Sequence, residues 1–224
     1  MPWMCARKVL EAVTCSQLRT ELEGTAAAIS AQAKEHVHAD EMILTFGAGR
    51  LLERFLRSAR RYRLLLAEGA RRGSHAMAAR LSAAGVPVTV LGSAAVCAVM
   101  ARVNKVRPPP PPSLRAASTW PGVTAVTGVS CCQVVMEVEA ALAGGAALGA
   151  PGLHALTAAA KFYSVPVLAL CPLHALSPLH ARAPALRAAL TQPAHALPYQ
   201  AAGAVAPLCD LVPADHITLY ITNL

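Results

Sequence analysis

The chain has 224 residues, of which 55% are hydrophobic and only 4% aromatic, and it carries a formal net charge of +8. This length suits one α/β domain with a small appendage. The seven cysteines show no regular spacing that would indicate a disulfide framework or a zinc site. The longest uncharged stretches contain several Gly or Pro residues, which disfavours a transmembrane helix. We therefore expect a cytosolic protein with no membrane partner and no bound metal.

The first part of the chain is predicted to be helical over residues 7–38, where apolar side chains recur at roughly helical spacing. Such a segment does not fold alone, so it should pack on the domain that follows or on a partner. His36 and His38 form an H-x-H pair near its end. No carboxylates or cysteines cluster around them in the sequence, so we expect a loop or interface position and not a metal site.

Between Asp40 and Val106, short apolar runs alternate with amphipathic segments at lengths typical of strand–helix units. The predicted strands are residues 42–46, 64–67 and 86–91, and the predicted helices are residues 50–60, 75–84 and 94–101. A fourth strand should begin at Lys105. Such an alternation requires a mostly parallel sheet with helices on both faces, so the predicted fold class is α/β.

A run of five prolines that follows Arg107 interrupts this pattern. Polyproline adopts an extended helix that cannot form a central strand, so residues 107–134 are predicted to be an insertion. The elements predicted after it are strands at 134–138, 165–170 and 217–222, a helix at 154–162, a small-residue loop from Leu142 to Gly152, and a long surface loop over 172–207. The expected organisation is an N-terminal helical segment, residues 1–39, followed by one domain, residues 40–224.

Two glycine pairs are candidates for a phosphate-binding loop. Gly47 and Gly49 lie between a predicted strand and the helix that begins at Arg50, where backbone amides can hold an anion. Gly144 and Gly145 follow another predicted strand. Neither pair has the third glycine of a dinucleotide fingerprint or the GK[ST] of a P-loop, so no cofactor is predicted.

No set of residues in the sequence forms a recognisable catalytic constellation. The G-x-S-x-G motif is absent, and no cysteine has a histidine partner by motif. Glu68 ends a predicted strand at the carboxyl edge of the sheet, where ligand crevices form. A carboxylate in that position more often caps a helix or faces solvent, so no catalytic constellation can be assembled from these residues.

Arginines are concentrated between Arg50 and Arg80. One explanation is an acidic protein or nucleic-acid partner, and the other is a solvated helix face. Aromatic residues for base stacking are not interleaved with the arginines, which favours the solvated face and argues against direct nucleic-acid binding.

Many short motifs follow one another in a fixed order along the chain. They are Leu22–Gly24, Asp40–Arg50, His75–Met77, Ala98–Val106, Leu142–Gly145, Gly152–His154, Ala159–Lys161, Cys171–Pro178, Cys209–Pro213 and Ile217–Asn223. In this order they resemble the regulatory, alpha-, beta- and delta-type subunits of eukaryotic translation initiation factor 2B. The Cys-Pro and Leu-Ser-Pro pieces and the ending are most similar to the beta type. The likeness covers nearly the whole chain outside residues 107–134, and it implies a Rossmann-like domain.

The resemblance implies a non-catalytic role in translation initiation. Regulatory subunits of this kind form a core that senses phosphorylated initiation factor 2 and holds the gamma and epsilon subunits, of which epsilon carries guanine-nucleotide exchange. The expected partners of this chain are therefore alpha, gamma, delta and epsilon siblings and initiation factor 2. Surfaces, and not a pocket, should carry the function. The candidate interface residues are Arg50, Arg54, Arg57, Cys171, Pro172, Ser177, Pro178, Asp210, Pro213 and Thr218.

Two alternatives stay open. The same superfamily includes sugar-phosphate isomerases of the methylthioribose 1-phosphate type, which resemble N-G-x-x-x-N-K-x-G-T where this chain has residues 144–153. The Asn-Lys pair is replaced here by Gly149-Ala150, the enzymes' Asp falls near Glu139, and their catalytic Cys has no counterpart, which argues against isomerase activity. The second alternative is a degenerate paralogue that cannot assemble, because the chain looks truncated relative to the family and carries the insertion.

Overall fold

The structure is a computed structural model that describes residues 2–69, 73–103, 132–182 and 208–223. Its helices are α1 (Pro2–Ala31), α2 (Ala33–His36), α3 (Arg50–Ser58), α4 (Ser74–Ala83), α5 (Val96–Val103) and α6 (Leu153–Phe162). Its strands are β1 (Glu41–Phe46), β2 (Tyr62–Ala67), β3 (Val88–Leu91), β4 (Cys132–Glu137), β5 (Ala140–Ala143), β6 (Ala147–Gly149), β7 (Val167–Leu170), β8 (Leu176–His180), β9 (Asp210–Val212) and β10 (Leu219–Ile221). Short 3-10 turns are η1 (Ser93–Ala95), η4 (Leu173–Ala175) and η6 (Ala214–His216).

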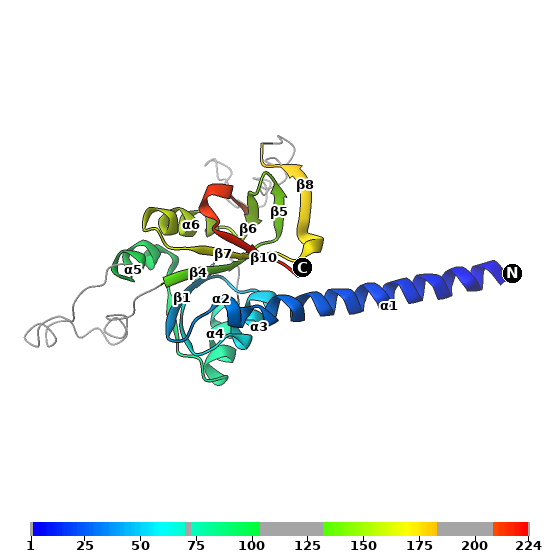
Figure 1. The fold of residues 1–224 in the computed structure, drawn as a ribbon, viewed down its shortest axis with the longest axis horizontal. Helices are drawn as coiled ribbons and strands as arrows, with labels where there is room; N and C mark the ends of the chain where they lie inside the picture. The colour runs from blue at the N-terminus through cyan, green and yellow to red at the C-terminus, as the bar shows by residue number, and fades with distance from the viewer. Residues whose placement is uncertain (1, 70–72, 104–131, 183–207, 224) are drawn as a thin grey trace, which may run out of the picture.

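Six strands form the main sheet in the order β10-β7-β4-β1-β2-β3 (Figure 1). The chain fills this sheet outward from β1, first through β2 to β3, and then on the other side of β1 through β4 and β7 to β10. The described pairings between these neighbours are parallel. The prediction of an α/β fold with a mostly parallel, Rossmann-like sheet is therefore confirmed. The sheet changes its direction of growth between β1 and β4, where open parallel sheets form ligand crevices.

Helices cover both faces of the main sheet because side chains alternate between the faces along each strand. In β1, Ile43 packs in one apolar cluster with Phe55 of α3. Its neighbour Leu44 packs in another cluster with Met100 of α5 and Leu156 of α6. These side chains are at most 2% exposed. Figure 1 shows α3 and α4 on one side of the sheet and α5 and α6 on the other, so the core consists of two layers.

The N-terminal helix α1 extends away from the domain, while its C-terminal end packs next to α3 (Figure 1). Ile29 near this end is fully buried in the cluster that contains the apolar face of α3. Gln32 Nε2 donates to Thr222 O at 2.7 Å, and Asn223 Nδ2 donates to Thr25 Oγ1 at 3.4 Å. The predicted N-terminal helix is therefore confirmed, and its end is anchored on the domain. No helix in the described part of the chain combines the length and the apolar character needed to cross a membrane.

A second sheet of four short strands has the order β8-β5-β6-β9. Strands β5 and β6 form an antiparallel hairpin, and its turn contains Gly144 and Gly145 with positive φ angles of 91° and 80°. The prediction of a small-residue loop from Leu142 to Gly152 is wrong over this hairpin. Leu142 and Ala147 are buried there, and Ala140 and Ala141 of β5 pair with Leu148 and Ala147 of β6.

Two other predictions fall partly outside the described residues. The long surface loop predicted over 172–207 is wrong at its start, because β8 pairs there with β5, and residues 183–207 are outside the described ranges. Most of the predicted insertion, residues 107–134, is also outside them. The chain is described again from Cys132, where β4 occupies the position next to β1.

Candidate functional site at the carboxyl ends of β1 and β4

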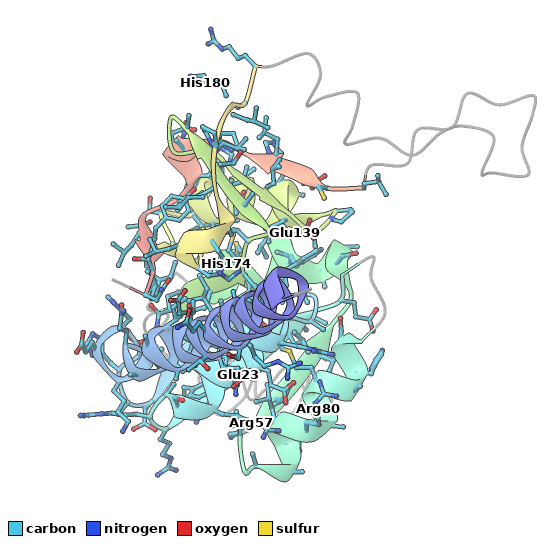
Figure 2. All side chains as sticks on the ribbon, turned by 90° about the vertical axis from the view of Figure 1, so that its right-hand side faces the viewer. Glu23, Arg57, Arg80, Glu139, His174 and His180 are labelled. Atoms are coloured by element: carbon cyan, nitrogen blue, oxygen red, sulfur yellow. The ribbon has the colours of Figure 1, made fainter. Side chains whose placement is uncertain are left out.

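A cavity of about 550 Å³ lies at the carboxyl ends of β1 and β4, where the main sheet changes its direction of growth. Its walls come from the loop after β1, the start of α3, the end of β4, the segment around η4 and the last turns of α1. The lining includes Leu22, Thr25, Phe46, Gly47, Gly49, Arg50, Leu52, Arg54, Glu137, Glu139, Pro172 and His174. Figure 2 shows Glu139 and His174 on one side of α1, with Arg57 and Arg80 on the other.

The loop from Gly47 to Gly49 brings the N-terminus of α3 to this cavity. Gly47 has a positive φ of 71°, and its N–H donates to Ala67 O at 2.9 Å, so the chain turns sharply where β1 ends. Gly49 is the N-cap of α3, and no side-chain hydrogen bond caps the helix from this position. The first amides of α3 therefore require an acceptor from another part of the chain.

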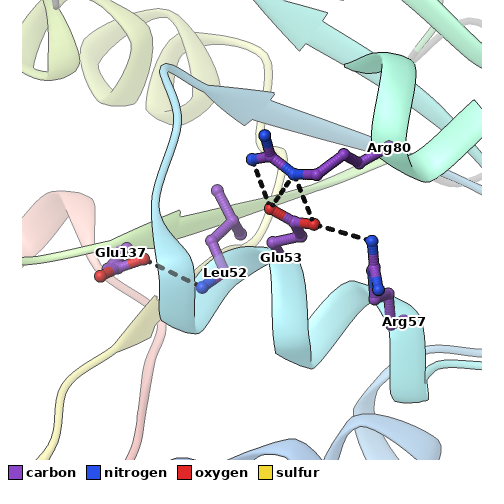
Figure 3. Close-up of polar contacts among 5 residues, drawn as sticks. All are labelled: Leu52, Glu53, Arg57, Arg80 and Glu137. Carbon is purple, nitrogen blue, oxygen red and sulfur yellow. Dashed lines mark hydrogen bonds and ion pairs between the residues drawn. The ribbon is translucent and has the colours of Figure 1, made fainter. Parts of the chain in front are cut away.

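That acceptor is Glu137, the last residue of β4. Its Oε2 accepts a hydrogen bond from the N–H of Leu52 at 2.9 Å (Figure 3). A Cβ atom placed on Gly49 would lie 1.9 Å from the same oxygen, so only glycine permits this approach. Burial raises the pKa of Glu137 above its usual range, and hydrogen bonds from the N–H groups of Leu52 and Leu51 oppose this shift.

The raised pKa of Glu137 predicts that Glu137→Gln stabilises the folded chain at neutral pH. A carboxyl group whose pKa is raised by folding contributes stability below its ordinary value of 4.5 and loses that contribution as the pH rises through the folded-state pKa. Glutamine stays neutral and keeps an oxygen acceptor for the N–H of Leu52. We expect its melting temperature to exceed that of the wild type by about 1–3 °C at pH 7.5.

The measurement is thermal unfolding between pH 4.5 and pH 8, with Glu139→Gln as the control from the same cavity wall. The advantage of Glu137→Gln should shrink as the pH falls, because the wild-type side chain then becomes protonated as well. A Glu137→Gln protein that melts below the wild type at pH 7.5 would contradict the assigned direction of the pKa shift.

A basic face covers the outside of α3 and the neighbouring helix. Glu53 of α3 accepts hydrogen bonds from Arg80 of α4, the shortest at 2.7 Å, and forms an ion pair with Arg57 at 3.0 Å (Figure 3). The hydrogen bonds from Arg80 and the charges of both arginines lower the pKa of Glu53 despite its partial burial. Arg50 and Arg54 are exposed and line the margin of the cavity.

The predicted interface residues differ in their exposure. Arg50, Arg54 and Arg57 of α3 are exposed, as a contact surface requires. Cys171 at the end of β7 is fully buried, so it belongs to the core and not to an outer surface. Pro172, the next residue, is partly buried and lines the cavity.

Two of the predicted interface residues hold elements of the domain together. The Asp210 carboxylate accepts hydrogen bonds from the N–H groups of Gly152 at 2.8 Å and His154 at 3.2 Å, so it caps the N-terminus of α6. Thr218 Oγ1 accepts a hydrogen bond from the N–H of Val167 at 3.0 Å and connects the start of β10 to β7. Their polar groups thus have partners within the fold.

The remaining predicted interface residues lie on or beside edge strands. Ser177 and Pro178 are in β8, which forms one edge of the small sheet, and Pro213 directly follows β9 at the other edge. Pro178 is exposed, whereas Ser177 and Pro213 are partly buried.

The other sequence candidates are separated from the cavity or paired elsewhere. Gly144 and Gly145 lie in the β5–β6 turn, and a strand, not a helix, follows them. Glu68, after β2, forms a contact of 2.7 Å with His75 of α4. Within the described ranges, no group of three or more His, Cys, Asp or Glu side chains is arranged to hold a metal ion.

The glycine loop of the site was predicted from the sequence, but the carboxylate of Glu137, which lies against the start of α3, was not. Glu137 is an acidic residue at the end of the apolar run that begins at Val134, and this position in the run was the available signal. The sequence also gave no indication that Leu22 and Thr25 of α1 would line the cavity. Both contacts depend on which segments become neighbours in space.

Comparisons with known proteins relate this chain to initiation-factor subunits. A model of the Initiation factor 2 subunit family matches residues 5–107. The chain is 29% identical over 216 residues to translation initiation factor eIF2B subunit beta of Schizosaccharomyces pombe, which covers 91% of this chain and 48% of that protein. It is 29% identical over 225 residues to the subunit of the same name from Dictyostelium discoideum, covering 93% of this chain and 49% of that protein. The chain thus spans about half the length of the curated relatives it matches.

Solved structures show the same fold. The tetrameric eIF2B-beta2-delta2 complex from C. thermophilum contains a chain that matches with a TM-score of 0.66 and 22% identity, over 93% of this chain and 57% of that one. The translation initiation factor eIF-2B of Pyrococcus horikoshii matches with a TM-score of 0.70 and 15% identity, over 97% of this chain and 68% of that one. At these identities the structures support the fold alone. The family model confirms the resemblance carried by the sequence motifs, and the two relatives confirm that this resemblance is to the beta type.

Proposed function

Because this chain is related in sequence to the initiation factor 2 subunit family, we propose that it is a non-catalytic regulatory subunit of the guanine-nucleotide exchange factor for initiation factor 2. In this role it assembles in the cytosol with siblings of the alpha, gamma, delta and epsilon types and helps to sense phosphorylated initiation factor 2. The observation that carries the proposal is the match to two beta subunits over more than nine tenths of this chain.

The edges of the two sheets support a role in assembly. β10 is one edge of the main sheet, and β8 and β9 are the two edges of the small sheet. Edge strands keep unpaired backbone groups that pair readily with another chain. Apolar side chains on these strands are also exposed, with Leu176 at 53%, Leu179 at 51% and Leu219 at 41%. Such edges are suited to a protein partner.

The direct test is affinity purification of the endogenous protein from cytosol, followed by mass spectrometry of what is recovered with it. Recovery of the alpha, gamma, delta and epsilon siblings is the expected result. A protein that is recovered alone, at full expression and with its fold intact, would contradict the proposal. A turnover assay on methylthioribose 1-phosphate would then examine the isomerase alternative.

The basic face of α3 gives a prediction about this assembly. Replacing Arg54 and Arg57 together by Glu changes the local charge by four units, from +2 to −2, on a surface that we propose to contact an acidic region of a sibling. Like charges brought together at an interface weaken binding. We expect recovery of the siblings to fall at least about tenfold, which corresponds to ~1.4 kcal/mol.

Lys161→Glu is the matched control for charge reversal, because Lys161 lies on α6, on the opposite face of the sheet, where it pairs with Asp215. The control should keep the siblings bound. Equal recovery for the wild type and the Arg54/Arg57 double variant, with unchanged exchange activity, would exclude the α3 face as a contact surface.

A further inference from the structure

The N-terminus of α3 has the local structure of an anion site. Gly47 turns the chain at the end of β1, and Gly49 leaves the first helix amides without a side-chain cap. Free amides and the positive end of the helix dipole attract phosphate groups at such positions. Arg50 and Arg54 add positive charge at the margin of the same cavity.

In this chain the side chain of Glu137 occupies the N-terminus of α3. The Oε2 atom of Glu137 lies 2.9 Å from the N–H of Leu52 and accepts its hydrogen bond (Figure 3). The close approach of the same oxygen to Gly49 shows that the side chain lies directly against the start of the helix. A phosphate group that approached these amides would have to displace the carboxyl group and move it into the cavity.

Electrostatic repulsion adds to this steric exclusion. An ionised Glu137 and a phosphate would be like charges at one helix terminus, in a site whose wall also contains Glu139. The cavity volume of about 550 Å³ is large enough for a small ligand, so its size alone does not exclude one. Glu137 is therefore the residue that determines whether a phosphate group can bind at the N-terminus of α3.

We infer that Glu137 is the resident anion of the α3 N-terminus and that it closes the cavity between β1 and β4 to ligands that carry a phosphate group. The chain thus combines a glycine loop and a helix terminus of the kind that can hold a phosphate group with a carboxyl group of its own at that terminus. This inference concerns the cavity and is independent of the proposed assembly role, because its test uses the isolated chain without siblings.

The test compares the wild type with Glu137→Ala, using inorganic phosphate and ribose 5-phosphate as probes. Isothermal titration and the phosphate dependence of the melting temperature report binding, and the amide signal of Leu52 in nuclear magnetic resonance reports its position. We expect no saturable shift of the Leu52 amide in the wild type. The alanine variant should bind the probes at least about tenfold more tightly, because it frees the helix amides and removes one negative charge.

Glu139→Ala is the matched control, since it removes a carboxylate from the same cavity wall and leaves Glu137 in place. It should gain no binding at the Leu52 amide. A wild-type protein that binds phosphate there, an alanine variant that gains nothing, or a control that gains as much as Glu137→Ala would each overturn the inference.

A second variant covers the case in which Glu137→Ala fails to fold. Glu137→Gln keeps an oxygen acceptor next to Leu52 and loses the charge, so it should still gain phosphate binding over the wild type, by less than the alanine variant. The absence of any gain in a folded Glu137→Gln protein would also overturn the inference.

Discussion

Phe55→Ala is expected to lower the free energy of unfolding by about 3–5 kcal/mol, because it removes a large aromatic side chain from the centre of the core. Phe55 is fully buried on the inner face of α3, and it shares its apolar cluster with Ile43 of β1 and Ile29 of α1. The substitution therefore removes packing among α3, β1 and α1. The measurement is equilibrium unfolding in urea, in which the midpoint should fall while the m-value stays the same.

The exposed Phe162 at the end of α6 provides the matched control for this substitution. Its side chain is 80% exposed, so Phe162→Ala removes an aromatic ring of the same size without leaving a cavity. We expect a change within about 0.5 kcal/mol in the isolated chain. Equal losses for the two variants would contradict the placement of Phe55 between the sheet and α1.

Gly152→Ala should cost roughly 2–4 kcal/mol through backbone strain and overpacking together. Gly152 is the N-cap of α6 with φ at 102°, a conformation that side chains disfavour. An added Cβ would lie 2.4 Å from Cζ of Phe46, a residue that lines the cavity. We therefore expect a lower melting temperature. The nuclear magnetic resonance signal of the Phe46 ring, which packs against Gly152, should also weaken.

Gly24→Ala is the matched control, because Gly24 lies within α1 and no heavy atom is within 4 Å of an added Cβ. Alanine is the better helix former, so this variant should keep or raise the melting temperature. The free energy of unfolding should rise by up to about 1 kcal/mol. A Gly152→Ala protein as stable as Gly24→Ala would mean that Gly152 is not constrained as described.

The main sheet could be predicted from the sequence because its strands are short apolar runs between clear helix signals. Residues 42–46 and 64–67, for example, fall within β1 and β2. The small sheet could not be predicted in this way. The residues 140–143 and 147–149 are mostly alanine, leucine and glycine, which carry a weak strand signal, and they form strands through pairing with distant segments.

The site was only half predictable for a related reason. The turn from Gly47 to Gly49 is local, so its glycines mark it in the sequence. Glu137 reaches Leu52 across 85 positions of the chain, and this contact exists because β4 pairs with β1. A carboxylate at a strand end is ordinarily read as a solvent-exposed or capping group. Here it caps a helix that belongs to another strand–helix unit.

We propose that this chain assembles as a regulatory subunit, and co-expression with a delta-type sibling tests this proposal most directly. The mass of the purified species, measured by native mass spectrometry, distinguishes a mixed complex from the separate chains. We expect a mixed complex that contains both chains, and the Arg54/Arg57 double reversal should weaken it. Separate chains under conditions in which a related beta subunit binds the same sibling would contradict the proposed assembly.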